Sequence, residues 1–403
     1  MKKALVLGGT VPHAFLIDRL KEKGYETILV DYTSNPPAKS HADKHIQESS
    51  LDSSMVLKIA KDEKVDLVIS TCIDQANSIA CYVGEKLSLP IPYSYEISLD
   101  VTRKGRMKAI FKENDIPTSD YYVLNKNDSR VINLDFPVVI KPTDANSSKG
   151  VFKINSKEEF FEKIEESFSF SREGKTIVER FVNGTEIQVD CIAVDGQATV
   201  LMTRDKTTLQ LPGKELQVSG FSIPGKLCES YRKQLEEIAQ KIATAFKLIN
   251  TPFFYQAICN ESGVYVLEFA PRIAGGTTYD MVQKYSGVDY LEAAICSFTG
   301  DVIQLTPIFS DSIFTTRFLY MKPGVFNSVV GLDGLLSSDS RYSFFPFVVS
   351  GKAINESLSS GNRIGGIMVK TQDYEEADIL INNALNAISV VDVNGNDLSF
   401  WKE

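Results

Sequence analysis

A single carboxylate, Glu268, stands within an apolar run of the sequence and could take part in chemistry. Residues 264–270 (VYVLEFA) are rich in β-branched and aromatic types, which is typical of a strand. Alternation along a strand puts Val264 and Val266 on the face that also carries Glu268. A carboxylate is costly to bury among apolar groups unless something pairs with it, so we expect a partner close by.

A second apolar run, residues 253–259, precedes this strand and could form a hairpin with it. If residues 261–263 make a three-residue turn with a left-handed glycine, Gln256 falls opposite Glu268 on the same face. Two oxygen-bearing side chains side by side on a sheet can hold a hard cation such as Mg²⁺. The sequence therefore predicts a metal site on this hairpin.

Arg272 follows Glu268 by four residues, behind a proline and ahead of Gly275 and Gly276. One interpretation is a structural ion pair between Arg272 and Glu268 at the strand end. The other is a contact to a ligand, because the two glycines let the backbone come close to one. We expect the catalytic contact.

Lys141 ends a continuous apolar strand at residues 136–142 (FPVVIKP). Lysine is seldom drawn into such a setting without an anion to meet, so a phosphate is a candidate partner. Residues 144–150 then form a loop of small residues whose N–H groups could cradle phosphate. As an isolated loop, a segment of this kind is more often an ordinary turn.

The elements expected before these strands form an open parallel α/β domain at residues 1–98. Residues 3–9 and 27–31 read as strands on either side of a helix, followed by a strand at 67–70 and a helix at 75–87. The glycines after the first strand (GGTVPH) do not match GxGxxG, which argues against a dinucleotide site.

Two further segments could contact a nucleotide. Residues 101–117 read as a basic helix closed by an Ile-Pro turn, and most of its cations are expected to be solvated. Residues 176–186 (TIVERFVNGTE) read as a hinge between lobes. This hinge could be purely structural, or its backbone near Arg180 and Val182 could pair with an adenine edge while Glu186 accepts from ribose hydroxyls.

Composition limits the function classes. The chain of 403 residues is long enough for two to four domains, and 43% hydrophobic with 24% charged residues is typical of a soluble globular protein. A net charge of −9 argues against nucleic acid or an anionic membrane as partner. The six cysteines form no CxxC, which favours reduced thiols in a cytoplasmic protein. All three histidines lie within the first 45 residues, so a metal near Glu268 should be held by oxygen.

Taken in order, Arg103 and the segments FPVVIKP, SSKG, VERFVNGTE and LEFAPR resemble the ATP-grasp family of carboxylate ligases, over nearly the whole chain. The resemblance implies a mixed α/β and α+β fold of three parts. These parts are an N-terminal Rossmann-like (pre-ATP-grasp) domain at 1–98, a two-lobed ATP-grasp domain at 99–300 with lobes of about 99–180 and 181–300, and a small α+β domain at 301–403.

The resemblance also implies roles for individual residues. The residues expected at ATP are Arg103 and Lys141 at the phosphates, Ser147, Ser148 and Gly150 in a covering loop, Glu179 and Val182 at adenine, and Glu186 at ribose. Gln256 and Glu268 are expected to bind Mg²⁺, with Mn²⁺ as an alternative ion. Arg272 is expected at the reacting phosphoryl group. Many members carry Asn where Ala270 stands, and alanine cannot ligate a second cation.

The implied activity is ATP-dependent activation of a small carboxylate, an amino acid above all, for attack by an amine. The alternatives are a ribonucleotide or biotin-type carboxylase that uses bicarbonate, and a non-catalytic nucleotide-binding module. Arg204 and Lys206 could bind the substrate carboxylate or remain solvated. The expected partners are small molecules rather than nucleic acid or membrane, and a homodimer is compatible with the family.

Overall fold

The computed structural model describes residues 1–126, 135–144, 150–209, 217–355 and 362–402. The chain divides into two compact units, and each is considered by itself. The first consists of Met1–Gly184, Val189–Met202 and Tyr231–Phe309, and the second of Thr185–Gln188, Thr203–Ser230 and Ser310–Glu403. The first unit thus holds the predicted N-terminal domain together with most of the predicted ATP-grasp domain. The boundaries predicted near residues 98 and 300 stay predictions.

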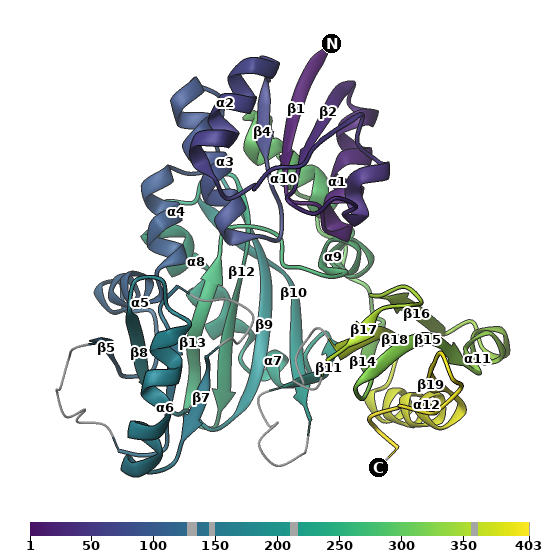
Figure 1. Cartoon of the computed structure of the whole chain (residues 1–403). Coiled ribbons are helices and arrows are strands. Elements are labelled where there is room, and N and C mark those ends of the chain that lie inside the picture. The colour runs from purple at the N-terminus through teal and green to yellow at the C-terminus, as the bar shows by residue number, and fades with distance from the viewer. Residues whose placement is uncertain (127–134, 145–149, 210–216, 356–361, 403) are drawn as a thin grey trace. The chain divides into compact units, whose positions relative to one another are not determined.

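The first unit begins with a four-stranded parallel sheet of order β3-β2-β1-β4 (Figure 1). Its elements are β1 (Lys2–Leu7), α1 (Val11–Glu22), β2 (Tyr25–Val30), a 3-10 helix (Pro37–Ser40), β3 (Lys44–Ile46), α2 (Ser53–Glu63), β4 (Leu67–Ile69) and α3 (Asp74–Leu87). Strand residues such as Leu5, Val6 and Ile28 are completely buried, as expected when helices cover a parallel sheet. The predicted parallel α/β arrangement is confirmed.

Two helices, α4 (Tyr95–Thr102) and α5 (Lys104–Glu113), lead into a four-stranded antiparallel sheet of order β5-β8-β6-β7. Its elements are β5 (Tyr121–Asn125), β6 (Val138–Pro142), β7 (Phe152–Ile154), α6 (Lys157–Ser169) and β8 (Lys175–Arg180). Apolar residues of β6 and β8, among them Ile140 and Val178, pack with Phe160 of α6 to form the core. The single helix predicted over 101–117 is interrupted at Arg103, whose backbone is extended.

The remainder of the first unit is organised around an antiparallel hairpin of β12 (Thr251–Asn260) and β13 (Gly263–Ala270) (Figure 1). Three helices accompany it: α8 (Arg232–Ala245), α9 (Thr278–Ser286) and α10 (Tyr290–Thr299). Helix α10 packs against β12 and β4. Its Tyr290 hydroxyl donates to the carbonyls of Cys191 and Phe253 at 2.6 and 3.0 Å, which fixes the helix against the strands.

The second unit is built on antiparallel strands in the order β10-β11-β14-β18-β16. These are β10 (Gln197–Thr208, of which Thr203 onward belongs to this unit), β11 (Val218–Ile223), β14 (Ile313–Tyr320), β18 (Arg363–Thr371) and β16 (Tyr342–Pro346). A smaller sheet combines β17 (Ala353–Ile354), β15 (Gly324–Val330) and β19 (Ser389–Asp392), with helices α11 (Leu332–Ser338) and α12 (Tyr374–Ala387). Ile367 and Val369 of β18 pack against Ile381 of α12 in the core. This confirms the predicted α+β character of the C-terminal part.

Helices α7 (Lys226–Ser230) and α8 and strand β9 (Thr185–Val194) lie where the chain passes between the two units. Helix α7 of the second unit is separate from α8 of the first, because Tyr231 between them lies outside helical geometry. Strand β9 contributes residues to both units. All six cysteines are free thiols, and five of them are buried. Within the ranges given above, no helix is long and apolar enough to cross a membrane.

Candidate active site

The hairpin of β12 and β13 places Gln256 directly opposite Glu268. This confirms the predicted pairing, although the turn is shorter than predicted because Asn260 already pairs with Gly263. A β-bulge between Gln256 and Ala257 compensates for the shorter turn. The predicted pair therefore forms through a shorter turn and a β-bulge rather than through a three-residue turn.

The same bulge puts Glu268 on a different face from Val266. Val266 pairs with Ala257, whereas Glu268 pairs with Gln256, the preceding residue of β12. Neighbouring residues of a strand point to opposite faces, so the prediction that Glu268 and Val266 share a face was wrong. Val266 is completely buried, while Gln256 and Glu268 are half-buried. The extra residue spares the carboxylate an apolar environment.

Lys141, at the end of β6, meets a buried carboxylate. Val139 is opposite Glu179 on β8, so Lys141 lies diagonally across from Glu179. The Lys141 Nζ lies 2.6 Å from Glu179 Oε1, and the lysine side chain is 12% exposed. A second lysine, Lys108 of α5, lies 2.9 Å from Oε2 and is completely buried. The lysine expected to meet an anion thus faces a carboxylate that it shares with another cation.

The two lysines determine the protonation of Glu179. Burial by itself would raise the pKa of Glu179, but the charges of Lys108 and Lys141 and their hydrogen bonds outweigh burial and lower this pKa to about 2. Burial lowers the pKa of Lys108, and the charge of Glu179 opposes that effect. Glu179 is therefore ionised at neutral pH, and a lysine contacts each of its two carboxylate oxygens.

We expect Glu179 to make the fold sensitive to acid. The unfolded chain takes up this proton near pH 4.5, whereas the folded chain keeps Glu179 charged down to about pH 2. The stabilisation is present above pH 4.5 and is lost as pH falls through 2. In denaturant titrations across this range, the unfolding free energy should fall more steeply for the wild type than for Glu179→Gln. Equal slopes would contradict the ionised cluster.

Two lysines of α5 are more buried than the sequence suggested. Lys108 is completely buried and Lys104 is half-buried. Burial lowers the pKa of Lys104, and the charge of Glu268 opposes this shift, so Lys104 lies in the field of the predicted metal ligand. Helical spacing could have revealed this, because Lys104, Lys108 and the buried Phe111 recur at i, i+4 and i+7. The expectation of solvated cations holds for Lys112, whose side chain is 51% exposed.

Other residues predicted at the phosphates are placed as follows. Arg103 lies at the break between α4 and α5, with its Nε 3.2 Å from Glu173 Oε1 and its side chain 42% exposed. Gly150 has φ +69°, and a Cβ there would lie 2.8 Å from Phe170 and 2.9 Å from Pro142, so the position requires glycine. Ser147 and Ser148 lie outside the described residues. The phosphate roles of these residues remain predictions.

Arg272 forms a two-pronged ion pair with Asp74, the first residue of α3. Its Nε lies 2.6 Å from Asp74 Oδ1 and its Nη2 2.6 Å from Oδ2. Burial by itself would lower the pKa of Arg272, but the Asp74 carboxylate raises it above its ordinary value. The guanidinium also lies over the ring of Phe254, 5.1 Å from its centroid. Asp74, rather than Glu268, is thus its carboxylate partner.

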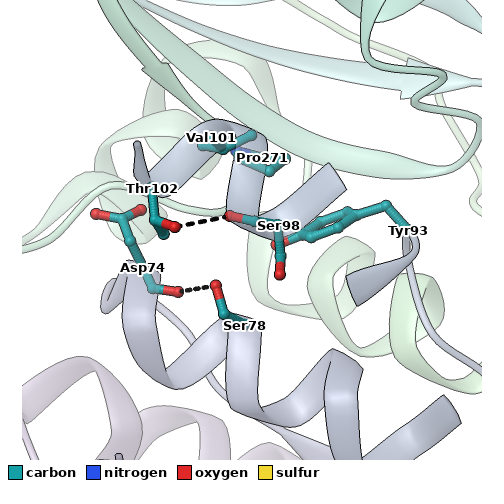
Figure 2. Close-up of a pocket in the computed structure, with 7 residues that line it drawn as sticks. All are labelled: Asp74, Ser78, Tyr93, Ser98, Val101, Thr102 and Pro271. Atoms are coloured by element: carbon teal, nitrogen blue, oxygen red, sulfur yellow. Dashed lines mark hydrogen bonds between the residues drawn. The ribbon is translucent and has the colours of Figure 1, made fainter. Parts of the chain in front are cut away.

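A small recess adjoins this ion pair (Figure 2). Asp74, Ser78, Tyr93, Ser98, Val101, Thr102 and Pro271 line it. Figure 2 shows two hydrogen bonds between side chains and backbone there, from Ser78 Oγ to the Asp74 carbonyl and from Thr102 Oγ1 to the Ser98 carbonyl. Both bonds run from a hydroxyl to the carbonyl four residues earlier in the same helix, α3 or α4.

Two sequence families match the chain. One, described as ATP-grasp domain, matches residues 134–280. The other, described as L-amino acid ligase C-terminal domain 2, matches residues 317–392. Residues 134–280 thus carry an ATP-grasp domain. The matches confirm the predicted fold and the resemblance to ATP-grasp proteins.

Three similar proteins illustrate the range of this ATP-grasp group. Formate-dependent phosphoribosylglycinamide formyltransferase from Bacteroides thetaiotaomicron is 26% identical, over 68% of this chain and 71% of the relative. D-alanine–D-alanine ligase from Halothermothrix orenii is 28% identical, over 62% of this chain and 76% of the relative. The crystal structure of L-amino acid ligase from Bacillus licheniformis has a TM-score of 0.80 at 16% identity, covering 97% of this chain and 99% of that one.

The segment predicted to be a hinge carries Val182 and Glu186 after β8. Val182 is half-buried in the loop, and Glu186 lies in β9 within the second unit. Lys206 Nζ lies 2.5 Å from Glu186 Oε1, so Lys206 is neither solvated nor placed by itself for a substrate. Arg204 is also buried, 7% exposed, with its guanidinium 5.3 Å from the Phe221 ring centroid. The alternative in which these two cations remain solvated is therefore wrong, whereas the nucleotide roles of Val182 and Glu186 remain predictions.

The donor set on the ATP-grasp hairpin suits magnesium. Gln256 and Glu268 offer one amide and one carboxylate from the same face of the sheet. Among the residues that the structure describes, no cluster of three or more His, Cys, Asp or Glu could hold a metal. Mg²⁺ needs no such cluster, because it commonly binds one or two protein oxygens together with waters and substrate phosphates. The residues present therefore fit Mg²⁺ in the company of a nucleotide.

Proposed function

We propose that this protein is an ATP- and Mg²⁺-dependent ligase that joins a small carboxylate to an amine. The observation that carries the proposal is the cross-strand pair of Gln256 and Glu268, with Lys104 in the electrostatic field of Glu268. Such a combination offers oxygen ligands for a cation and positive charge for phosphates. The match to the L-amino acid ligase C-terminal domain supports an amino acid as the carboxylate.

The residues of the proposed site would have two roles, binding of the cation and binding of the phosphates. Glu268 and Gln256 would hold Mg²⁺, and Lys104 and Lys141 would meet phosphate oxygens. Mg²⁺, when bound, supplies charge neutralisation between the phosphates. Phosphoryl transfer to a carboxylate requires positioning and charge stabilisation more than a protein nucleophile, so no nucleophilic residue is invoked.

The proposed reaction has two steps. An oxygen of the substrate carboxylate attacks the γ-phosphorus of ATP, the bond to ADP breaks, and an acyl phosphate forms. The amine nitrogen then attacks the acyl carbon, phosphate leaves, and the nitrogen loses a proton to give the amide. Arg272 would stabilise the charge that develops on the transferring phosphoryl group with its planar guanidinium.

A screen for ADP and phosphate release tests this function. Pairs of amino acids should stimulate release in the presence of Mg²⁺, and the stimulation should not depend on bicarbonate. Stimulation that requires bicarbonate would favour a carboxylase. The sequence Glu-x-Ala-Pro-Arg at residues 268–272 supports this alternative, because it resembles the variant found in the carboxylase branch of the family. ATP binding without release over all pairs would favour a non-catalytic nucleotide-binding module.

We further propose that the protein acts on small molecules in the cytoplasm. The excess of acidic residues, with a net charge of −9, supports partners other than nucleic acid or anionic membranes. The free cysteines are consistent with a reducing compartment. A homodimer is the assembly to test first, by light scattering at assay concentrations.

Lys141→Ala should weaken ATP binding. Loss of one charge-assisted hydrogen bond should cost roughly 1.5–3 kcal/mol of binding free energy. Glu179 would keep its pair with Lys108, so the variant should remain folded. Calorimetric titration with ATP and Mg²⁺ measures the effect, and unchanged affinity in a folded variant would make Lys141 a structural residue.

A further inference from the structure

Lys108 is a completely buried lysine with three close oxygen partners. Its Nζ donates to Thr118 Oγ1 at 2.6 Å, to Ser119 Oγ at 3.2 Å and to Glu179 Oε2 at 2.9 Å. An ammonium group has three protons to donate, so these contacts satisfy it. Burying such a cation is costly without a function or a paired charge, and here the paired charge is Glu179.

The two oxygens of Glu179 face different surroundings. Oε2 accepts from Lys108 and Ser119, which are both buried. Oε1 meets Lys141, which retains partial exposure at the end of β6. Two lysines therefore serve a single carboxylate, and these three groups together carry one net positive charge.

We propose that Lys108 is a positioning residue that compensates Glu179 from the interior and so keeps Lys141 electropositive toward an incoming phosphate. This inference rests on the proposed nucleotide role of Lys141. Without Lys108, Lys141 and Glu179 would form a neutral pair, and a phosphate would have to compete with Glu179 for the lysine. With Lys108 present, Glu179 stays neutralised when Lys141 turns to the nucleotide.

A purely mechanical role for Lys108 is disfavoured by the neighbouring hydrogen bonds. Thr118 Oγ1 donates to the carbonyl of Val266 at 2.7 Å, which ties residue 118 to β13. Ser119 Oγ donates to Glu179 Oε2 at 2.9 Å, which ties residue 119 to β8. These links connect the strands without the lysine, whose own contact to the Val266 carbonyl is longer, at 3.5 Å. What Lys108 adds to them is charge.

The test is the ATP affinity of four proteins at fixed Mg²⁺: the wild type, Lys108→Met, Glu179→Gln and the double variant. Lys108→Met should raise the dissociation constant of ATP by about tenfold or more, because it leaves Lys141 in a neutral pair. The double variant again has one net positive charge, so it should bind ATP at least about threefold more tightly than Lys108→Met. Lys112→Met, on the same helix but exposed, is the matched control and should bind ATP like the wild type.

The outcomes distinguish charge from packing. Unchanged ATP affinity in Lys108→Met, or a double variant that binds as weakly as or more weakly than Lys108→Met, would overturn the proposal. If Lys108→Met does not fold, Lys108→Gln supplies the same comparison with polar contacts kept. If Lys141→Ala also leaves ATP affinity unchanged, the nucleotide role of Lys141 is what fails. Absence of ADP release with ATP affinities as predicted would instead contradict the ligase activity alone.

Discussion

Glu268→Gln should reduce ADP-forming turnover by more than about 10²-fold, the scale on which loss of one charge-stabilising contact acts. The variant keeps the shape of the side chain and an oxygen donor but removes the only carboxylate of the Gln256–Glu268 pair. Glu268 is half-buried and outside the buried face of Val266, so the fold should be retained. Steady-state ADP release over a range of Mg²⁺ concentrations measures the loss, and high Mg²⁺ should recover part of it.

Two variants on the same hairpin serve as controls for this prediction. Glu261→Gln makes the same chemical change in the exposed turn and should leave turnover and Mg²⁺ dependence unaltered. Gln256→Glu adds a second carboxylate opposite the first and should lower the Mg²⁺ concentration needed for half-maximal activity. A Glu268→Gln variant with wild-type turnover and Mg²⁺ dependence would remove Glu268 from the metal site.

Short-range patterns predicted the strands and the cross-strand pairing of Gln256 with Glu268 well. The hairpin joins runs that are close in sequence, so apolar alternation and a glycine turn were enough to place Gln256 opposite Glu268. The β-bulge was not predictable from the same pattern, because an extra residue depends on how both faces pack rather than on the turn. The pair was therefore predicted correctly and the face of Val266 incorrectly.

Long-range pairings were beyond the sequence pattern. Lys108 and Glu179 are separated by 71 residues, and Asp74 and Arg272 by 198. Nothing in the local spacing of Arg272 indicates which carboxylate it meets, so the nearby Glu268 was the natural candidate. The signal for the burial of Lys108 was its helical spacing from the apolar Phe111. The many basic residues of the segment instead favoured the prediction of a solvated helix face.

Because Arg272 pairs with Asp74, a test of its catalytic role must also measure the stability of the variant. The side chain of Arg272 is only 12% exposed and that of Asp74 25% exposed, so removing either partner leaves a poorly solvated charge behind. Such a loss can cost roughly 3–5 kcal/mol of unfolding free energy whatever the catalytic role of the arginine. Alanine at position 272 would therefore confuse stability with catalysis.

Arg272→Lys separates the two effects, because lysine keeps the positive charge and loses the planar fork. We expect a folded protein, less stable by roughly 1.5–3 kcal/mol through loss of one charged hydrogen bond to Asp74. Turnover per folded molecule should fall by about 10²-fold, because a lysine cannot present two parallel donors to the transferring phosphoryl group. Asp74→Asn is the matched variant: it weakens the same ion pair but retains the guanidinium, so it should lose comparable stability and much less turnover. Thermal unfolding and ADP release, measured on both proteins below their melting transitions, decide the matter. If Arg272→Lys is destabilised yet turns over like the wild type, the arginine serves the fold through Asp74 and not the reaction.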